Sequence, residues 1–374
     1  MADRATVFEG CQIGGEEVAG TEVSAGVKLQ SLSIEPGMQA GISFFRPMGQ
    51  KFDTLSALGK EWVQANITGK ATYTEIVYAL ASILGKPDIQ TPGGGTLARS
   101  WTFTIDADGP DTPQTYTVEA GGSVRAHKFV YGILNEFGID FSRDEIALSG
   151  SMLGRALQDA ISMSPVVTVI GLVPILPTQV DVYLADTAAG LDIAAPLTRP
   201  LTLKWSLTDR FGMVYPLAST NNTGWAAHIE KAPNMTATMV MEADAEGMAL
   251  LTTMRTGATK FLRIKATGVT DGIEAGQPYS FKLDMACQVA NPQEFSDQDG
   301  VFAVGWELKA VTDATWGKAI EVVVVNNLTA IAGAAGAPGL SSSPSVSSST
   351  SLSPSRSPSM SPSKSPSISP SPSA

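Results

Sequence analysis

The sequence is poor in the residues from which disulfide scaffolds and metal sites are built. It has two cysteines and two histidines in 374 residues. Because Cys11 and Cys287 are far apart and alone, they cannot form a disulfide framework, which argues against a small secreted fold and for a reducing compartment at synthesis. His127 and His228 have no His, Cys or Glu at zinc-binding spacing. We therefore expect no metal site and no cofactor.

Positive charge is also scarce. The chain has 25 Lys and Arg against 36 Asp and Glu, a formal net charge of -11. Non-specific binding to DNA depends on cations that neutralise phosphates, so this balance argues against a tight grip on nucleic acid. The most apolar run, residues 165–177, is too short to span a bilayer, and the N-terminus lacks the apolar core of a signal peptide. We expect no membrane anchor.

Catalytic motifs are missing as well. The stretch GSMLG around Ser151 has Met152 where a nucleophile elbow carries its serine. The stretch TGKAT lacks the first glycine of a phosphate-binding loop, and Gly93 to Gly95 are not followed by a helix with the dinucleotide pattern. We therefore predict a protein that is not an enzyme and has no catalytic residues.

The acidic stretch SDQDG, residues 296–300, is the segment most similar to a calcium-binding loop. Aligning Gly300 with the invariant glycine places Asp297 and Asp299 at ligand positions. The first ligand position then falls on Phe295 and the bidentate one on Trp306, which excludes the motif. Asp and Gly also favour tight turns, so we interpret the stretch as a corner between two strands.

What the sequence does contain is alternation of apolar and polar residues, which is typical of β-strands, interrupted by two short helical patterns. The first helix is predicted within residues 74–87, with Thr74 as its N-cap and an apolar stripe on one face. The second is predicted within residues 243–257, with acids in its first turn, Arg255 in its last and Gly257 after it.

The same order of elements follows both helices. A strand, a hairpin and a second strand lead into a long strand pair, with the first hairpin at residues 106–113. Acidic corners at residues 142–145 and 296–300 join the long strands, and the final strand is predicted within residues 318–328. We interpret this order as an internal duplication.

The predicted fold is mainly β, with two tandem β-sandwich or barrel domains that each carry a short flanking helix. The predicted segments are an N-terminal arm at 1–30, a first domain at 31–165, a second domain at 166–335 and a Ser/Pro-rich tail at 336–374. The tail repeats an SPS unit and cannot bury apolar surface, so we expect disorder. It is a solvated spacer or an exposed tag that adheres or is glycosylated.

Several stretches carry a resemblance to a known family. The N-terminal segment has a G-x-E-x-x-x-G-T-x-V pattern at Gly14, Glu16, Gly20, Thr21 and Val23. The strand and helix of residues 65–85, the long strands of residues 115–154 and the ending at residues 295–313 complete the likeness. In these features the globular part resembles the tail tube proteins, or major tail proteins, of long, flexible, non-contractile-tailed bacteriophages, in the type with two fused tube domains.

The resemblance implies a structural virion protein. Tube domains of this family join their sheets into rings, and three two-domain chains make a ring with pseudo-sixfold symmetry. Rings stack into the tail tube, through which genomic DNA passes without specific binding. The implied partners are further copies of the chain, the tape measure protein and the tail terminator and tip proteins. The implied location is the phage tail, after assembly in the bacterial host cytoplasm.

Two further expectations concern surfaces. Some acids are expected to face the channel, where cations would retain phosphates. The N-terminal segment and the loop at 106–113 are predicted to make contacts between stacked rings, because long connections tend to carry interactions. The alternative function is an adhesion, receptor-binding or tail-decoration module that displays the Ser/Pro tail. A tail-tip hydrolase would need an active site that the sequence does not show.

Overall fold

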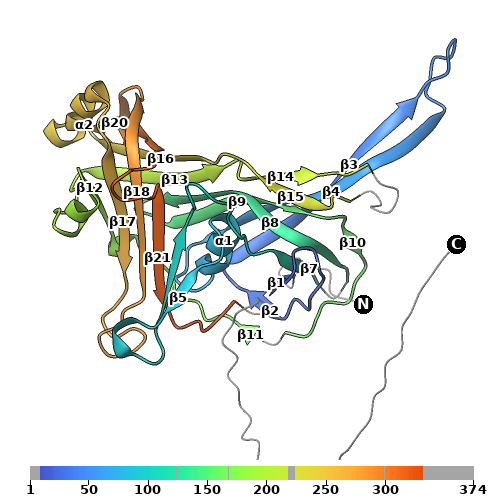
Figure 1. Ribbon diagram of the computed structural model, residues 1–374, viewed down its shortest axis with the longest axis horizontal. Helices are drawn as coiled ribbons and strands as arrows, with labels where there is room; N and C mark the ends of the chain where they lie inside the picture. The colour runs from blue at the N-terminus through green and yellow to red at the C-terminus, as the bar shows by residue number, and fades with distance from the viewer. Residues whose placement is uncertain (1–8, 123, 167, 218–223, 299, 332–374) are drawn as a thin grey trace, which may run out of the picture. The chain divides into compact units, whose positions relative to one another are not determined.

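The computed structural model describes residues 9–122, 124–166, 168–217, 224–298 and 300–331 (Figure 1). Asp299 and the tail predicted at 336–374 lie outside these residues. Within them the protein is mainly β, as predicted, and 19 strands belong to one hydrogen-bonded network.

The first half of the chain contains the strands β1 to β10. Their bounds are β1 (Gly10–Gly15), β2 (Val27–Leu29), β3 (Leu32–Phe45), β4 (Leu55–Lys70), β5 (Asp88–Gln90), β6 (Arg99–Thr104), β7 (Tyr116–Gly121), β8 (Ala126–Phe141), β9 (Ile146–Gly154) and β10 (Gln158–Asp159). The helix α1 (Ile76–Ile83) and the short 3-10 turn η2 (Pro92–Gly94) lie between β4 and β6.

The second half contains β11 to β21. Their bounds are β11 (Thr168–Val169), β12 (Val180–Ala185), β13 (Pro200–Thr208), β14 (Phe211–Val214), β15 (Ala227–Glu230), β16 (Asn234–Glu242), β17 (Lys260–Thr267), β18 (Ser280–Pro292), β19 (Ser296–Gln298), β20 (Val301–Ala310) and β21 (Ile320–Asn326). The helix α2 (Ala245–Thr256) follows β16, and the 3-10 turns η3 (Pro177–Gln179) and η4 (Ala189–Asp192) flank β12.

The helix α1 is present as predicted and its apolar stripe is buried, but the other sides of the helix are buried as well. The prediction that Thr74 caps the helix was wrong, because its hydroxyl donates to the backbone oxygen of Gly171 at 2.8 Å. The N-cap residue is Glu75, whose carboxylate accepts the backbone amides of Gln30, Ser31 and Leu32. The start of α1 is therefore fixed to the segment that enters β3.

The helix α2 agrees with the prediction. The Asp244 carboxylate accepts the backbone amides of Glu246 and Gly247, which satisfies donors that a helix start leaves free. Gly257 ends the helix at a φ of 66°, a left-handed conformation that glycine adopts without strain.

The two acidic corners are confirmed as connections between paired strands. The corner at 142–145 joins β8 to β9, and the one at 296–300 includes β19, which pairs with β20. The Asp297 carboxylate accepts the backbone amide of Gly300 at 2.8 Å, so this acid holds a turn. The predicted final strand is also present, as β21.

The predicted hairpin at 106–113 is wrong. β6 pairs with β5 and β21, whereas β7 pairs with β1 and β8, so the loop between β6 and β7 crosses from one part of the sheet to another. Its Asp111 forms an ion pair with Arg210, a side chain that is almost completely buried. The turn residues Asp, Gly and Pro are therefore used for a crossover.

Strand order is repeated between the halves. Successive antiparallel pairs give the order β3, β4, β9, β8 in the first half and β13, β16, β20, β18 in the second. In both halves, the second strand of this order leads into a helix. The third and fourth strands follow one another in the sequence, apart from the short β19 between β18 and β20. β8 pairs with β13, from Phe137 opposite Leu207 to Phe141 opposite Leu203, and this junction makes one continuous sheet. The division into two domains at 165/166 remains a prediction.

Candidate assembly surface

The continuous sheet has one face packed against the core. A row of paired residues crosses all eight strands on this face: Leu32, Gly69, Leu148, Ile139, Trp205, Ala237, Leu308 and Val289. Apart from the glycine, every member of the row is buried. Burial of these side chains from both halves fixes the register across the junction, because a slip of one residue would turn the whole row to the other face.

The opposite face is polar. The adjacent row of paired residues, one position away on every strand, consists of Ser33, Thr68, Ser149, Gly138, Ser206, Thr236, Lys309 and Gln288. Successive strand residues point to opposite faces, so short hydroxyl and amide side chains line this side. We call this surface the polar face.

Charges on the polar face are mixed, with a small excess of acids. In the central part of this face, around the paired rows, the acids are Glu35, Glu136, Asp140, Glu242 and Glu307, and the lysines are Lys70, Lys204 and Lys309. Lys70 is already paired with Glu145 at 2.9 Å, and cross-strand pairing places Lys204 opposite Asp140. Since carboxylates accompany these cations, the face offers little for a phosphate backbone to bind.

Both outer edges of the continuous sheet lack a further partner strand among the described residues. β3 pairs with no described strand other than β4, and at the start of its outer edge the Leu32 amide donates to the Glu75 carboxylate. At the other end, the pairing of β18 with β17 stops at Cys287, and residues 288–292 pair only with β20. The equivalent stretch of β8 is the one that pairs with β13. An edge without a partner strand is a place where a strand of another chain can pair.

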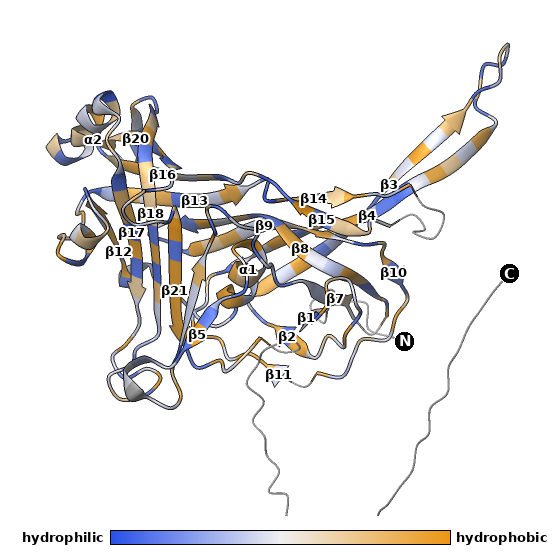
Figure 2. Cartoon of the chain, in the orientation of Figure 1, coloured by the Kyte–Doolittle hydropathy of each residue, from blue (hydrophilic) through white to orange (hydrophobic). Residues whose placement is uncertain are grey.

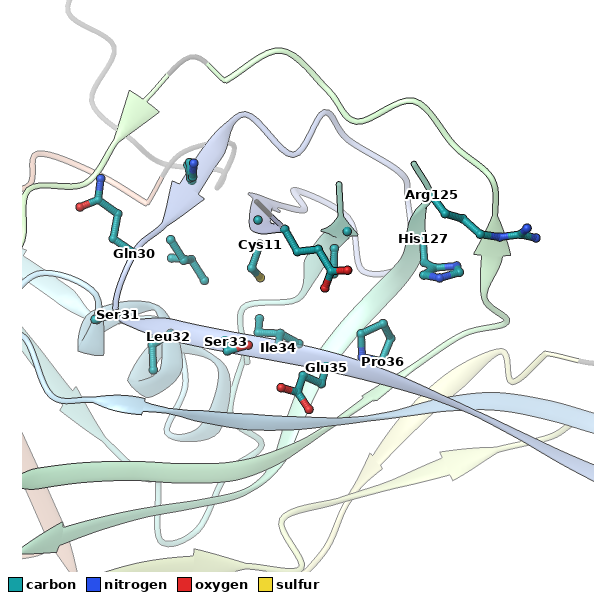
Figure 3. A pocket seen from close by; sticks show the side chains of 16 residues that line it. Cys11, Gln30, Ser31, Leu32, Ser33, Ile34, Glu35, Pro36, Arg125 and His127 are labelled. Atoms are coloured by element: carbon teal, nitrogen blue, oxygen red, sulfur yellow. The ribbon is translucent and has the colours of Figure 1, made fainter. Parts of the chain in front are cut away.

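A groove of about 800 Å³ runs along the first part of β3 (Figure 3). Residues from Leu29 to Pro36 form one wall, and the ends of β1, β7 and β8 form the other. Cys11 projects between the two walls, and Arg125 and His127 stand at one end. His127 lies 3.0 Å from the Asp159 carboxylate. The first part of β3 thus lines a groove that no other strand fills among the described residues.

The N-terminal pattern that carried the resemblance builds a buried anchor. The Glu16 carboxylate accepts four hydrogen bonds, from the Gly20 amide at 2.7 Å, the Thr115 hydroxyl at 2.8 Å, the Thr117 hydroxyl at 3.1 Å and the Tyr131 amide at 2.8 Å. Gly20 has a φ of 79°, and a Cβ there would lie 2.3 Å from the Tyr131 ring. The pattern therefore holds the segment after β1 against β7 and β8.

The other residues of the pattern support the same anchor. A Cβ at Gly14 would lie 2.3 Å from the backbone oxygen of Ser24, so the chain passes too close for a side chain. The Thr21 amide donates to the backbone oxygen of Val18, and the Val23 amide donates to the Thr117 hydroxyl. These contacts are structural, and they assign no ligand to the segment.

Exposed apolar side chains are concentrated on the outer part of the β3–β4 hairpin, residues 40–61, which we call the arm. Beyond Val63, β4 has no pairing partner except β3. Figure 1 shows this two-stranded ribbon projecting from the sheet, and Figure 2 colours much of it as hydrophobic. Its exposed large apolar residues are Ile42, Phe44, Phe45, Met48, Phe52, Leu55 and Leu58.

Sequence reasoning missed the arm. Its strands alternate like any others, and the composition does not reveal that neither face is covered. At the base of the arm, the Lys60 Nζ lies 5.4 Å from the ring centroids of both Trp62 and Tyr215.

The corresponding extension in the second half is covered. β13 and β16 continue into the ribbon β14–β15, which packs on β8 and β9 of the first half. Phe211 and Trp225 are buried against Tyr131, Ile133 and Leu153. The ribbon is also held by hydrogen bonds, including one from the Trp225 indole to the backbone oxygen of Gly154 at 2.9 Å and one from the Phe211 amide to the Asn135 side chain at 2.8 Å.

Metal and membrane features can be described for the same residues. His228 lies 3.1 Å from the Tyr131 hydroxyl, and no group of three or more His, Cys, Asp or Glu in the described chain could hold a metal ion. No helix in the described ranges is long and apolar enough to cross a membrane.

No protein-family model matches the chain, and no curated protein matches it.

Proposed function

We propose that the chain is the tail tube protein of a long-tailed bacteriophage and that copies of it close into rings that stack into the tube. In this proposal the open edge of β3 in one copy pairs with residues 288–292 of β18 in the next. Three copies with two repeats each give a ring with pseudo-sixfold symmetry. Closing a ring removes every open edge of the continuous sheet.

The single observation that carries the proposal is the pairing of β8 with β13. It joins two repeats of the same strand order edge to edge inside one chain. The edges that would repeat this junction, on β3 and on residues 288–292 of β18, pair with no further strand among the described residues. The chain thus contains one example of the contact that the ring requires between copies.

The polar face supports the second part of the proposal. If the core-packed face points outward, the polar face lines the channel, and genomic DNA passes over serine, threonine, amide and mixed charged side chains. The acids expected in the channel would then be Glu35, Glu136, Asp140, Glu242 and Glu307, whose carboxylates disfavour retention of phosphates.

The experiment that tests ring closure is negative-stain electron microscopy of the purified protein, with a proline in the β18 edge. Ala290 is exposed and lies between residues that pair with β20. The substitution Ala290→Pro removes a backbone donor at the proposed junction. We expect rings and tubes from the wild type and folded single chains from Ala290→Pro, while the matched control Ala290→Ser still assembles.

Other outcomes point elsewhere. Rings that form equally well from Ala290→Pro would exclude β18 as the closing edge. A wild-type protein that yields compact particles and never stacks would reject the tube and favour the adhesion module.

A further inference from the structure

The arm exposes many apolar side chains and projects from the sheet, so we expect it to contact a partner surface. A two-stranded hairpin is at best marginally stable by itself, and apolar patches of this size on soluble proteins mark interaction sites. Phe44, Phe45 and Leu55 are each more than half exposed, at 64%, 54% and 68%, and Phe52 is 79% exposed. In the second half, the β14–β15 ribbon that continues the equivalent strands is covered by another part of the protein. In the arm, by contrast, residues 42–59 are all exposed.

A second exposed aromatic feature lies at the other end of the continuous sheet. Phe295 and Phe302 stack with ring centroids 4.9 Å apart and an interplanar angle of 13°, yet they are 54% and 61% exposed. They flank the corner between β18 and β20, next to the start of α2, where the Ala243 amide donates to the backbone oxygen of Phe302. We call them the aromatic pair.

Strand register places the arm and the aromatic pair at opposite ends. The paired row Ile34, Ile67, Gly150, Phe137, Leu207 and Met235 crosses the sheet at the end from which β3 continues into the arm and β13 into β14. The aromatic pair lies beyond Glu242, at the far end of β16, where Glu242 pairs with Ala303. Figure 1 shows the same separation between the arm and the β20 corner beside α2.

We propose that the arm of one copy docks on the aromatic pair of a second copy, head to tail. The partner is this same chain, because it carries an apolar projection at one end and an exposed aromatic surface at the other. A contact between two different surfaces of identical chains propagates without limit, which produces a stack. This inference rests on the proposed tube and identifies the surfaces that join successive rings. The sequence alone had led us to expect these contacts in the N-terminal segment and the loop at 106–113.

Disulfide cross-linking tests the contact. Gln50 is an exposed polar residue at the tip of the arm, and Ser296 is an exposed polar residue beside the aromatic pair. The full-length variant carrying Gln50→Cys and Ser296→Cys is allowed to assemble and is then oxidised with copper phenanthroline. We expect a ladder of cross-linked chains longer than dimers on a non-reducing gel, and only single chains from either substitution alone.

The two native cysteines are not expected to form cross-links in this experiment. Burial raises the pKa of the Cys11 and Cys287 thiols to about 12, so neither forms the reactive thiolate at neutral pH. A variant that combines Gln50→Cys with Glu17→Cys, an exposed residue outside the proposed contact, serves as the matched control and should give no ladder.

A charge placed on the aromatic pair gives a second readout. In Phe302→Asp we expect isolated rings in electron micrographs and no tubes, whereas Ile193→Asp, at a residue that is 89% exposed elsewhere, should form tubes like the wild type. Tubes from Phe302→Asp, together with no ladder from the cysteine pair, would reject the docking and leave the tube standing. Dimers from Gln50→Cys alone would show that arms meet each other and would also reject it. A wild type that forms neither rings nor tubes would reject both proposals.

Discussion

At the scale of single residues, buried carboxylates position the segments that the sheet alone leaves loose. Glu16 and Glu75 are both buried, and each accepts several backbone and hydroxyl donors from segments distant in sequence. The hydrogen bonds that such a carboxylate accepts offset the free-energy cost of removing its charge from water. When the charge is removed, these donors lose a matching acceptor.

We expect Glu16→Gln to lower the free energy of unfolding by about 2 kcal/mol, because hydrogen bonds to charged groups contribute roughly that much. Urea denaturation measures the change. The matched control is Glu17→Gln at the exposed neighbouring position, which should alter stability little. Equal effects of the two substitutions would contradict the anchoring role of Glu16.

His228 gives the protein a pH dependence with a defined sign. Burial lowers the pKa of this imidazole below its usual 6.5, so the unfolded chain binds a proton at a higher pH than the folded one. Stability should therefore fall as the pH drops below 6.5, until the folded-state pKa is reached. In His228→Gln, urea denaturation at pH 7.5 and at pH 5.5 should show a smaller loss than in the wild type. A wild-type loss no larger than that of the variant would refute this contribution.

At the scale of elements, the sequence predicted the strands and α2 better than their partners. Asp, Gly and Pro at 106–113 favour a turn, but the same residues serve a hairpin and a crossover equally. The crossover is decided by β21, which pairs with β6 from far along the chain and whose Asn326 accepts the Trp101 indole at 2.8 Å. Local sequence carries no signal for such a pairing.

The helix α1 shows a similar limit. Ala79, Ala81 and Ser82 lie off its apolar stripe, yet all three are buried, and the Ser82 hydroxyl accepts the Leu134 amide at 2.9 Å. Small residues such as Ala and Ser are found both on exposed helix faces and on faces packed against a sheet. Periodicity alone therefore does not distinguish a surface helix from an enclosed one. The exposed arm was missed for the converse reason, since apolar alternation normally indicates burial.

Shortening the arm tests its role as an element. Replacing residues 42–59 by Asn-Gly between Gly41 and Lys60 keeps the inner pairs of β3 with β4 and closes them with a favoured hairpin turn. We expect unchanged or higher thermal stability, since no buried residue is removed, and rings that no longer stack in electron micrographs. Tubes of normal length from this variant would exclude the arm from stacking.

At the scale of the whole molecule, the duplicated strand order sets the expected assembly. Each chain supplies two repeats and one internal junction, so a ring of pseudo-sixfold symmetry needs three chains. We expect the arm-shortened variant to form rings that do not stack, so its native mass spectrum should show trimers as the main oligomer. A dominant hexamer would mean that the two repeats of a chain do not occupy equivalent positions in one ring.

The internal junction also changes the thermodynamics of closing the ring. When two repeats are tethered, their pairing is governed by an effective concentration and costs no independent association step. Half of the junctions in a ring of three chains would therefore be formed before any encounter between copies. In the proposed ring, the tether would also free the two repeats to diverge. A projecting arm and a docked ribbon would then alternate around the rim, and each ring would present three contact points in place of six.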